Sequence, residues 1–252
     1  MSNFNNIRAL WRLSWLIIYT LITLVTVPII FNPRTDKLPK KRQFVSFLYR
    51  RIYSALNIKL IVHGEPTKHP SLWVSNHISW VDILLFAGGH TVDFIAKSEV
   101  GDWPLIGNVV KKTGTVLIDR NNKFQAYRSL PLLQQRMRSG TPVLVFPEGT
   151  TTSGGRTLPF KPMFYQAAIR ENMLIQPISL HYVNSHGEPT DSIAFIDEDD
   201  FSISLRRILK QPRITAHIHF LPTLSADQYH RKIMARKNQK AINEKIKYSN
   251  TI

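Results

Sequence analysis

The chain has no cysteine among its 252 residues. Disulfides, thiolate metal sites and a cysteine nucleophile are therefore excluded, whereas the redox compartment stays undetermined. Acidic residues are also scarce, since 17 Asp and Glu stand against 33 Lys and Arg, giving a net charge of +16 and a pI near 10.2. Such a surface attracts polyanions, which include nucleic acid, anionic membranes and acidic proteins. Composition alone does not distinguish these partners, so other features of the sequence are needed to do so.

Several catalytic motifs are missing as well. The sequence has neither a G-x-S-x-G nucleophile elbow nor an H-E-x-x-H zinc motif. In GTTTSGGR (149–156) the glycines have phosphate-loop spacing, but the Lys-Ser/Thr pair that completes such a loop does not follow. The nine histidines show no metal-ligand spacing, so we expect metal-free chemistry. We expect His181, His217 and His219 to lie at the core edge or on the surface.

One apolar run is long. The 21 residues between Arg12 and Arg34 carry no formal charge, and a helix of about 20 apolar residues spans a bilayer core. Basic residues flank both ends, so a single span and a shallow hairpin turning near Pro28 both stay open, with a buried core helix as a third alternative. We expect residues 1–42 to be a membrane anchor with a basic linker. Residues 43–252 should form the main domain, on the cytoplasmic side of the cell inner membrane.

Short apolar runs alternate with helical patterns from residue 43 onward. The strand-like ranges are 58–63, 72–75, 92–96, 115–119, 142–146, 174–181, 193–195 and 214–220. The helical ranges are 43–56, 80–87, 122–139, 161–171, 201–210 and 226–247, of which the last is a basic surface helix or an interfacial one. This alternation predicts an α/β fold: a mixed, largely parallel central sheet flanked by helices, preceded by an apolar N-terminal membrane helix or helical hairpin.

The stretch SLWVSNHISWVD (71–82) ends an apolar run at His77, and Asp82 follows five positions later. An imidazole accepts a proton near neutral pH, and it is a better base when a carboxylate holds one ring nitrogen. The two side chains can meet if His77 lies on the entry to a helix and Asp82 in its first turns. With no cysteine and no serine elbow in the sequence, such a pair would most simply deprotonate a substrate hydroxyl. Because His-x4-Asp spacings are common, a purely structural corner is the alternative.

Two further strands end in polar groups. FPEGT (146–150) offers Glu148 together with Gly149, which allows close backbone approach to a ligand. GTVLIDR (114–120) ends in Arg120, whose guanidinium can hold a phosphate through two hydrogen bonds. Three polar strand ends indicate a ligand site outside the carboxyl edge of an α/β sheet.

The blocks NHISWVD, GTVLIDR, FPEGT and IQPISL (175–180) resemble, in order and spacing, the four motif blocks of the PlsC-like glycerolipid acyltransferases. The resemblance covers roughly residues 60 to 185. It implies an enzyme that moves a fatty acyl group from acyl-CoA or an acidic acyl-carrier protein to the free hydroxyl of a membrane lysolipid, without a cofactor. The acceptor it favours is 1-acylglycerol-3-phosphate, which would give phosphatidic acid, and lyso-ornithine lipid is the alternative.

By the same resemblance, His77 is the general base and Asp82 orients it. The residues expected to bind substrate are polar or glycine residues near the strand ends: Asn76, Lys97, Arg120, Glu148, Gly149, Thr150 and Arg156. Lys97 or the backbone amides near Gly149 are the candidates for stabilising the oxyanion.

One position departs from the family pattern. The third block commonly reads E-G-T-R, but Thr151 stands where the arginine would be. Threonine carries no fixed positive charge, so tight binding of a glycerol phosphate would need Arg120, Arg156 or Lys161 to compensate. The stretch 148–161 looks more like a bacterial subgroup that includes acyltransferases acting on lyso-ornithine lipid, an acceptor without phosphate.

Two other functions stay open from sequence. A basic nucleic-acid-binding protein would explain the charge of +16, but the basic residues are scattered and an apolar anchor suits that role poorly, so we expect no nucleic-acid partner. A hydrolase could use the same pair to activate water on an acyl thioester. An anionic membrane surface is the partner that the charge and the apolar run favour together.

Overall fold

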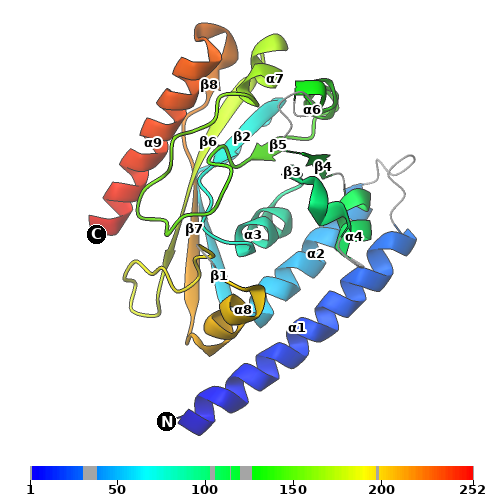
Figure 1. The fold of residues 1–252 in the computed structure, drawn as a ribbon, viewed down its shortest axis with the longest axis vertical. Helices are drawn as coiled ribbons and strands as arrows, with labels where there is room; N and C mark the ends of the chain where they lie inside the picture. Colours follow the sequence, from blue (N-terminus) through cyan, green and yellow to red (C-terminus); the bar gives the residue numbers. More distant parts are fainter. Residues whose placement is uncertain are drawn as a thin grey trace.

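The computed structural model describes residues 2–30, 39–102, 106–113, 115–119, 127–196 and 199–251. It has an eight-stranded sheet with helices on both faces (Figure 1). The strand order is β1 (Ile58–His63), β7 (Ile214–Phe220), β6 (Leu174–Val183), β2 (Ser71–Ser75), β5 (Val143–Val145), β3 (Asp93–Lys97) and β4 (Val116–Ile118), with β8 (Leu224–Ser225) beside β6. Pairing is parallel except where β6 meets β7 and β8. The expected mixed, largely parallel sheet is confirmed.

Two separate cores lie on the two faces of the sheet. One is covered by α2 (Pro39–Ala55), α3 (Val81–Gly89) and α8 (Phe201–Lys210), and the other by α6 (Leu130–Arg138), α7 (Tyr165–Arg170) and α9 (Arg231–Thr251). Side chains of a strand alternate between faces: Leu72 and Val74 enter the second core, whereas Trp73 between them enters the first. Both faces of β2 are therefore buried, which explains its continuous apolar run.

Helix α1 (Ser2–Ile30) lies outside these layers and continues through Pro28. Its Arg12 guanidinium donates hydrogen bonds to the carbonyls of Leu209 (3.1 Å), Gln211 (2.6 Å) and Pro212 (2.9 Å). These carbonyls are at the C-terminal end of α8, where a cation also favours the helix dipole. Arg12 therefore fixes α1 to the domain.

The outer surface of α1 is apolar. Its exposed large hydrophobic residues are Ile7, Leu10, Trp11, Trp15, Ile17, Ile18, Leu21, Ile22, Val25 and Ile29. By length and composition, the part from Asn6 to Ile30 could cross a membrane. On its packed side, Leu16 joins the core shared by α3 and α8, and Val27 packs with residues of α2 and α4 (Ile106–Lys112).

Some sequence-based boundaries need correction. The range 193–195 is not a strand but a buried loop, because the Arg207 side chain satisfies the carbonyls of Ser192 and Ala194 that a neighbouring strand would otherwise bind. Helix α4 was not expected. The expected helix 122–139 is observed as α6, and its first residues up to 126 lie outside the described part.

Candidate active site

The dyad expected from sequence forms where β2 meets α3. Strand β2 ends at Ser75, and α3 begins at Val81. His77 Nδ1 lies 2.8 Å from Asp82 Oδ2, so the two side chains meet across the entry to the helix. His77 donates from Nδ1 if Asp82 is ionised, and this tautomer directs the Nε2 lone pair outward. The described residues make no hydrogen bond to Nε2, and the His77 side chain is 15% exposed.

The Asp82 carboxylate organises the helix entry. Its Oδ2 accepts hydrogen bonds from the backbone N–H groups of Ile78 (2.7 Å) and Ser79 (3.0 Å), besides the one from His77. The N-cap residue Trp80 makes no side-chain cap. Because the carboxylate is fully buried, these donors satisfy its oxygen lone pairs and fix its position.

Sequence reasoning missed Tyr182, the residue that completes this network. Its hydroxyl donates a hydrogen bond to Asp82 Oδ1 at 2.5 Å. Burial raises the pKa of Tyr182 well above its ordinary value, and the Asp82 charge adds to that effect. Tyr182 is therefore a neutral donor at any physiological pH. The only sequence signal was an aromatic hydroxyl near the end of a buried strand.

Glu148, in the turn after β5, is hydrogen-bonded to the loop that carries His77. Its two carboxylate oxygens accept hydrogen bonds from the N–H of His77 (2.8 Å) and the N–H of Leu158 (2.7 Å). Burial raises the pKa of Glu148 to about 7, against the effect of both donors, and the Asp82 charge raises it further. Glu148 thus positions backbone on both sides of the site. Its predicted role in binding acceptor stays a prediction.

Neighbouring segments enclose His77. The Phe146 ring stacks on the imidazole at 4.0 Å between centroids. The N–H of Thr152 donates to the His77 carbonyl at 2.9 Å, and the N–H of Phe195 donates to the Ile78 carbonyl, also at 2.9 Å. The strand end at β5 and the loop that replaces the expected strand 193–195 therefore both border the dyad, as a site at the carboxyl edge of the sheet requires.

Gly149 has a positive φ of +77°, a conformation that favours glycine. Any Cβ at this position would lie 2.5 Å from the Lys161 ammonium, so the glycine lets that cation approach the turn. The Gly149 N–H donates to the Phe146 carbonyl at 3.2 Å. In this conformation the Gly149 amide is thus used within the turn, which weakens it as the oxyanion donor.

The other predicted substrate contacts are dispersed. Asn76 is buried, and its amide exchanges hydrogen bonds of 2.8 Å with the backbone of Leu180, so it clips β2 to β6. Arg156 lines a hollow with residues of α9, and Thr150 is exposed. Arg120 and the Lys97 side chain lie outside the described residues.

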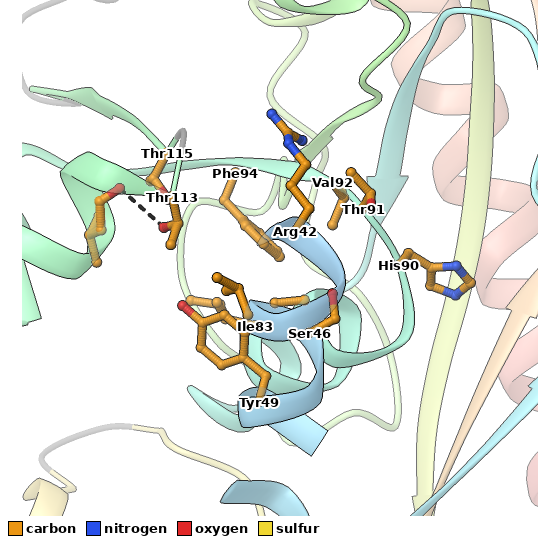
Figure 2. Close-up of a pocket in the computed structure, with 13 residues that line it drawn as sticks. Arg42, Ser46, Tyr49, Ile83, His90, Thr91, Val92, Phe94, Thr113 and Thr115 are labelled. Carbon is orange, nitrogen blue, oxygen red and sulfur yellow. Dashed lines mark hydrogen bonds between the residues drawn. The ribbon is translucent and has the colours of Figure 1, made fainter. Parts of the chain in front are cut away.

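Two further hollows lie in the described part of the chain. One is lined by Ile78 and Tyr182, by the loop 153–155 and by residues 189–191, together with His181. The other, shown in Figure 2, lies between α2, α3 and β3, where Tyr49, Ile83 and Phe94 face one another. The dyad residues do not line this second pocket, whose volume is about 70 Å³, so it cannot hold a fatty acyl chain in this conformation.

Comparison with known proteins agrees with this geometry. A family model described as Acyltransferase matches residues 59–181. Lyso-ornithine lipid O-acyltransferase from Pseudomonas aeruginosa is 33% identical over 210 residues, covering 83% of this chain and 81% of that protein. The 1-acyl-sn-glycerol-3-phosphate acyltransferase of Neisseria meningitidis serogroup B is 31% identical over 176 residues, or 69% of each chain. The chain belongs to the acyltransferase family.

The fold of the chain is shared with a solved structure. The crystal structure of PlsC, the 1-acyl-sn-glycerophosphate acyltransferase of Thermotoga maritima, matches with a TM-score of 0.70 at 18% identity, covering 97% of both chains. The resemblance carried by the four sequence blocks is confirmed, and the protein is an acyltransferase. The range matched by the family model contains the dyad, Glu148 and the turn at Gly149.

Proposed function

We propose that this acyltransferase transfers a fatty acyl group from a thioester donor to the free hydroxyl of a lysolipid, with His77 as general base. The observation that carries the proposal is the imidazole held at Nδ1 by Asp82 while Nε2 is left for a substrate. This is the arrangement that general-base catalysis requires.

The steps follow from that arrangement. His77 Nε2 takes the proton of the acceptor hydroxyl as its oxygen attacks the thioester carbonyl carbon. The new C–O bond forms, the C–S bond breaks, and the proton passes from His77 to the departing sulfur. Asp82 stabilises the imidazolium between these two transfers.

Direct transfer, without an acyl-enzyme, suits the residues present. The chain has no cysteine. In the described part of the chain, no serine or threonine hydroxyl makes a hydrogen bond with His77 Nε2. The nucleophile that the base activates would then be the acceptor hydroxyl itself.

We favour lyso-ornithine lipid as the acceptor, although the sequence-based expectation favoured 1-acylglycerol-3-phosphate. Thr151 replaces the arginine of the common third block, and its hydroxyl donates to the Phe195 carbonyl. This position therefore presents no cation to a phosphate. The 33% identical relative from Pseudomonas aeruginosa bears the name lyso-ornithine lipid O-acyltransferase.

The second candidate acceptor is 1-acylglycerol-3-phosphate. The observation in its favour is the Lys161 ammonium packed over Gly149, which could supply the positive charge that Thr151 lacks. The relative from Neisseria meningitidis is named for that reaction.

We further propose that α1 inserts its exposed apolar surface into the cell inner membrane, with the domain on the cytoplasmic side. Its opposite side packs on the domain, which would place the dyad near the lipid surface. The net charge of +16 would add attraction to anionic lipids.

Replacing His77 tests the mechanism. His77→Ala should lower turnover by about 10² to 10⁴-fold, the range that general-base catalysis contributes. The matched control is His69→Ala, because His69 is an exposed histidine whose side chain makes no described contact with the dyad. Turnover retained in His77→Ala at the level of His69→Ala would reject the base.

The acceptor is tested by comparing kcat/KM for lyso-ornithine lipid and 1-acylglycerol-3-phosphate, each with acyl-CoA and with acyl-carrier protein. We expect wild type to prefer lyso-ornithine lipid on the order of tenfold. Thr151→Arg should shift the ratio toward the phosphate acceptor, whereas Thr151→Val, which exchanges only the hydroxyl for a methyl group, should not. Equal ratios in wild type and Thr151→Arg would show that residue 151 does not select the acceptor.

A further inference from the structure

Four histidines gather on one face of the sheet, and in the described part of the chain none of them forms an ion pair with a carboxylate. We call His63, His181, His217 and His219 the histidine ladder. Strand pairing places His63 opposite His219 and His181 opposite His217, and the i, i+2 spacing of His217 and His219 puts both on one face of β7. The rings are stacked, with centroids 4.1 Å apart for His63–His219 and 4.9 Å apart for His181–His217.

The ladder leaves polar atoms unsatisfied. His63 Nε2 lies 2.9 Å from His217 Nδ1, which makes one hydrogen bond between two rings. His219 Nε2 and His181 Nδ1 are buried and make no hydrogen bond within the described structure. A buried nitrogen without a partner costs free energy, so a ligand that engages these lone pairs would be stabilised.

Three of the four rings can share one ion. Ligand nitrogens of His63, His217 and His219 lie within 4.8 Å of one another. A tetrahedral zinc ion with Zn–N distances of about 2.0 to 2.1 Å needs its nitrogens roughly 3.3 Å apart. Side-chain rotation can close that difference, since all three residues are only partly buried and the strands fix their backbones.

The ligand chemistry selects the class of ion. Three imidazole nitrogens suit Zn²⁺, Co²⁺, Ni²⁺ or Cu²⁺, whereas Mg²⁺ and Ca²⁺ require oxygen ligands. We propose that His63, His217 and His219 bind one divalent transition-metal ion, which links the edge strand β1 to β7. The cluster was not expected from sequence, because β1 and β7 are far apart along the chain and only the H-x-H spacing of His217 and His219 is local.

The charges around the ladder oppose a cation. Besides burial, the ammonium group of Lys245 on α9 lowers the pKa of His181 and of His219, and that of Lys59 lowers the pKa of His217. Imidazole ligands are neutral, so nothing in the set offsets these ammonium groups. Removing Lys245 should therefore strengthen metal binding severalfold.

The site is independent of the proposed acyl transfer. The ladder faces α9, whereas Tyr182, the next residue of β6 after His181, faces the dyad on the other side of the sheet. An ion at the ladder should therefore raise the melting temperature without being needed for turnover.

Cobalt titration of the full-length protein, purified in detergent without a polyhistidine tag, tests the proposal. Wild type should bind about one Co²⁺ and show the intense visible bands of tetrahedral cobalt. His217→Ala should weaken binding by at least about tenfold, and Lys245→Ala should strengthen it. The matched control is His186→Ala, an exposed histidine outside the ladder, which should bind like wild type.

A second variant is needed because His217→Ala could unfold the central strands and so lose metal binding indirectly. His63 lies on the edge strand, so His63→Gln is the mildest change to the cluster. Zn²⁺ should raise the melting temperature of wild type and of His186→Ala, but not that of His63→Gln. Absence of a tetrahedral cobalt spectrum in wild type, or unchanged binding in both His217→Ala and His63→Gln, would overturn the proposal.

Discussion

His77 and the histidine ladder lie toward opposite faces of β6, and their neighbours give them different chemistry. On one face of β6, Tyr182 supports Asp82, which holds the His77 ring. On the other face, the His181 ring stacks on the imidazoles of His217 and His219. Burial lowers the pKa of His181 to about 4 and that of His219 to about 3, with the neighbouring cations and rings adding to the effect.

The difference shows that the partner, and not the histidine, decides the chemistry. A carboxylate stabilises the imidazolium that forms during proton transfer. Stacked neutral rings cannot do so, but their lone pairs suit a transition metal. Substitutions on either face of β6 test this difference.

Asp82→Asn should make His77 resemble a ladder histidine, because the ring loses its carboxylate. The amide NH₂ would also face backbone donors that Asp82 now satisfies. We expect turnover to fall on the order of 10³-fold or more. Steady-state kinetics measures this loss, and circular dichroism of the same samples checks folding. A folded Asp82→Asn variant with near-normal turnover would remove the basis of the contrast.

Glu148→Gln should change how stability depends on pH. The folded-state pKa of Glu148 is raised from 4.5 to about 7, so folding favours its protonated form. The contribution of Glu148 to the free energy of unfolding is most favourable below about pH 4.5. It declines by up to roughly 3 kcal/mol as the pH rises to about 7. Urea unfolding between pH 5 and pH 8 should show this decline in wild type and a flatter profile in Glu148→Gln. Identical profiles would contradict the assignment.

Tyr182→Phe removes one of the hydrogen bonds to Asp82 without opening a cavity. Loss of a donor to a buried carboxylate should cost about 1 kcal/mol in the transition state, or roughly fivefold in kcat, with little change in KM. His181→Ala is the control on the other face of the strand and should leave kcat unchanged. Equal losses in the two variants would indicate a general effect on β6.

His219→Gln should have the smallest effect on catalysis. The ladder makes no described contact with His77 or Asp82, so turnover should stay within about twofold of wild type. The expected change is in metal binding alone. A large loss of turnover with an intact fold would show that the two faces are coupled through β6.

Local pattern predicted much of the fold and the centre of the site. The strands 58–63 and 214–220 and the helix 201–210 have the boundaries expected from periodicity, because alternation and helical spacing report which face is buried. His77 and Asp82 were found because both lie in one short segment. The range 193–195 was wrong, since an apolar run buried as a loop has the same local pattern as a buried strand.

The sequence alone determined the family, through four blocks whose order and spacing are local properties of the chain. It also determined the dyad, because its two members are only five positions apart in one segment. Only the tertiary structure decided that Tyr182 reaches Asp82, that Glu148 bridges His77 and Leu158, and that His63 joins His217 and His219. These contacts join residues that are far apart in sequence, so they depend on strand order and register, which no single segment encodes.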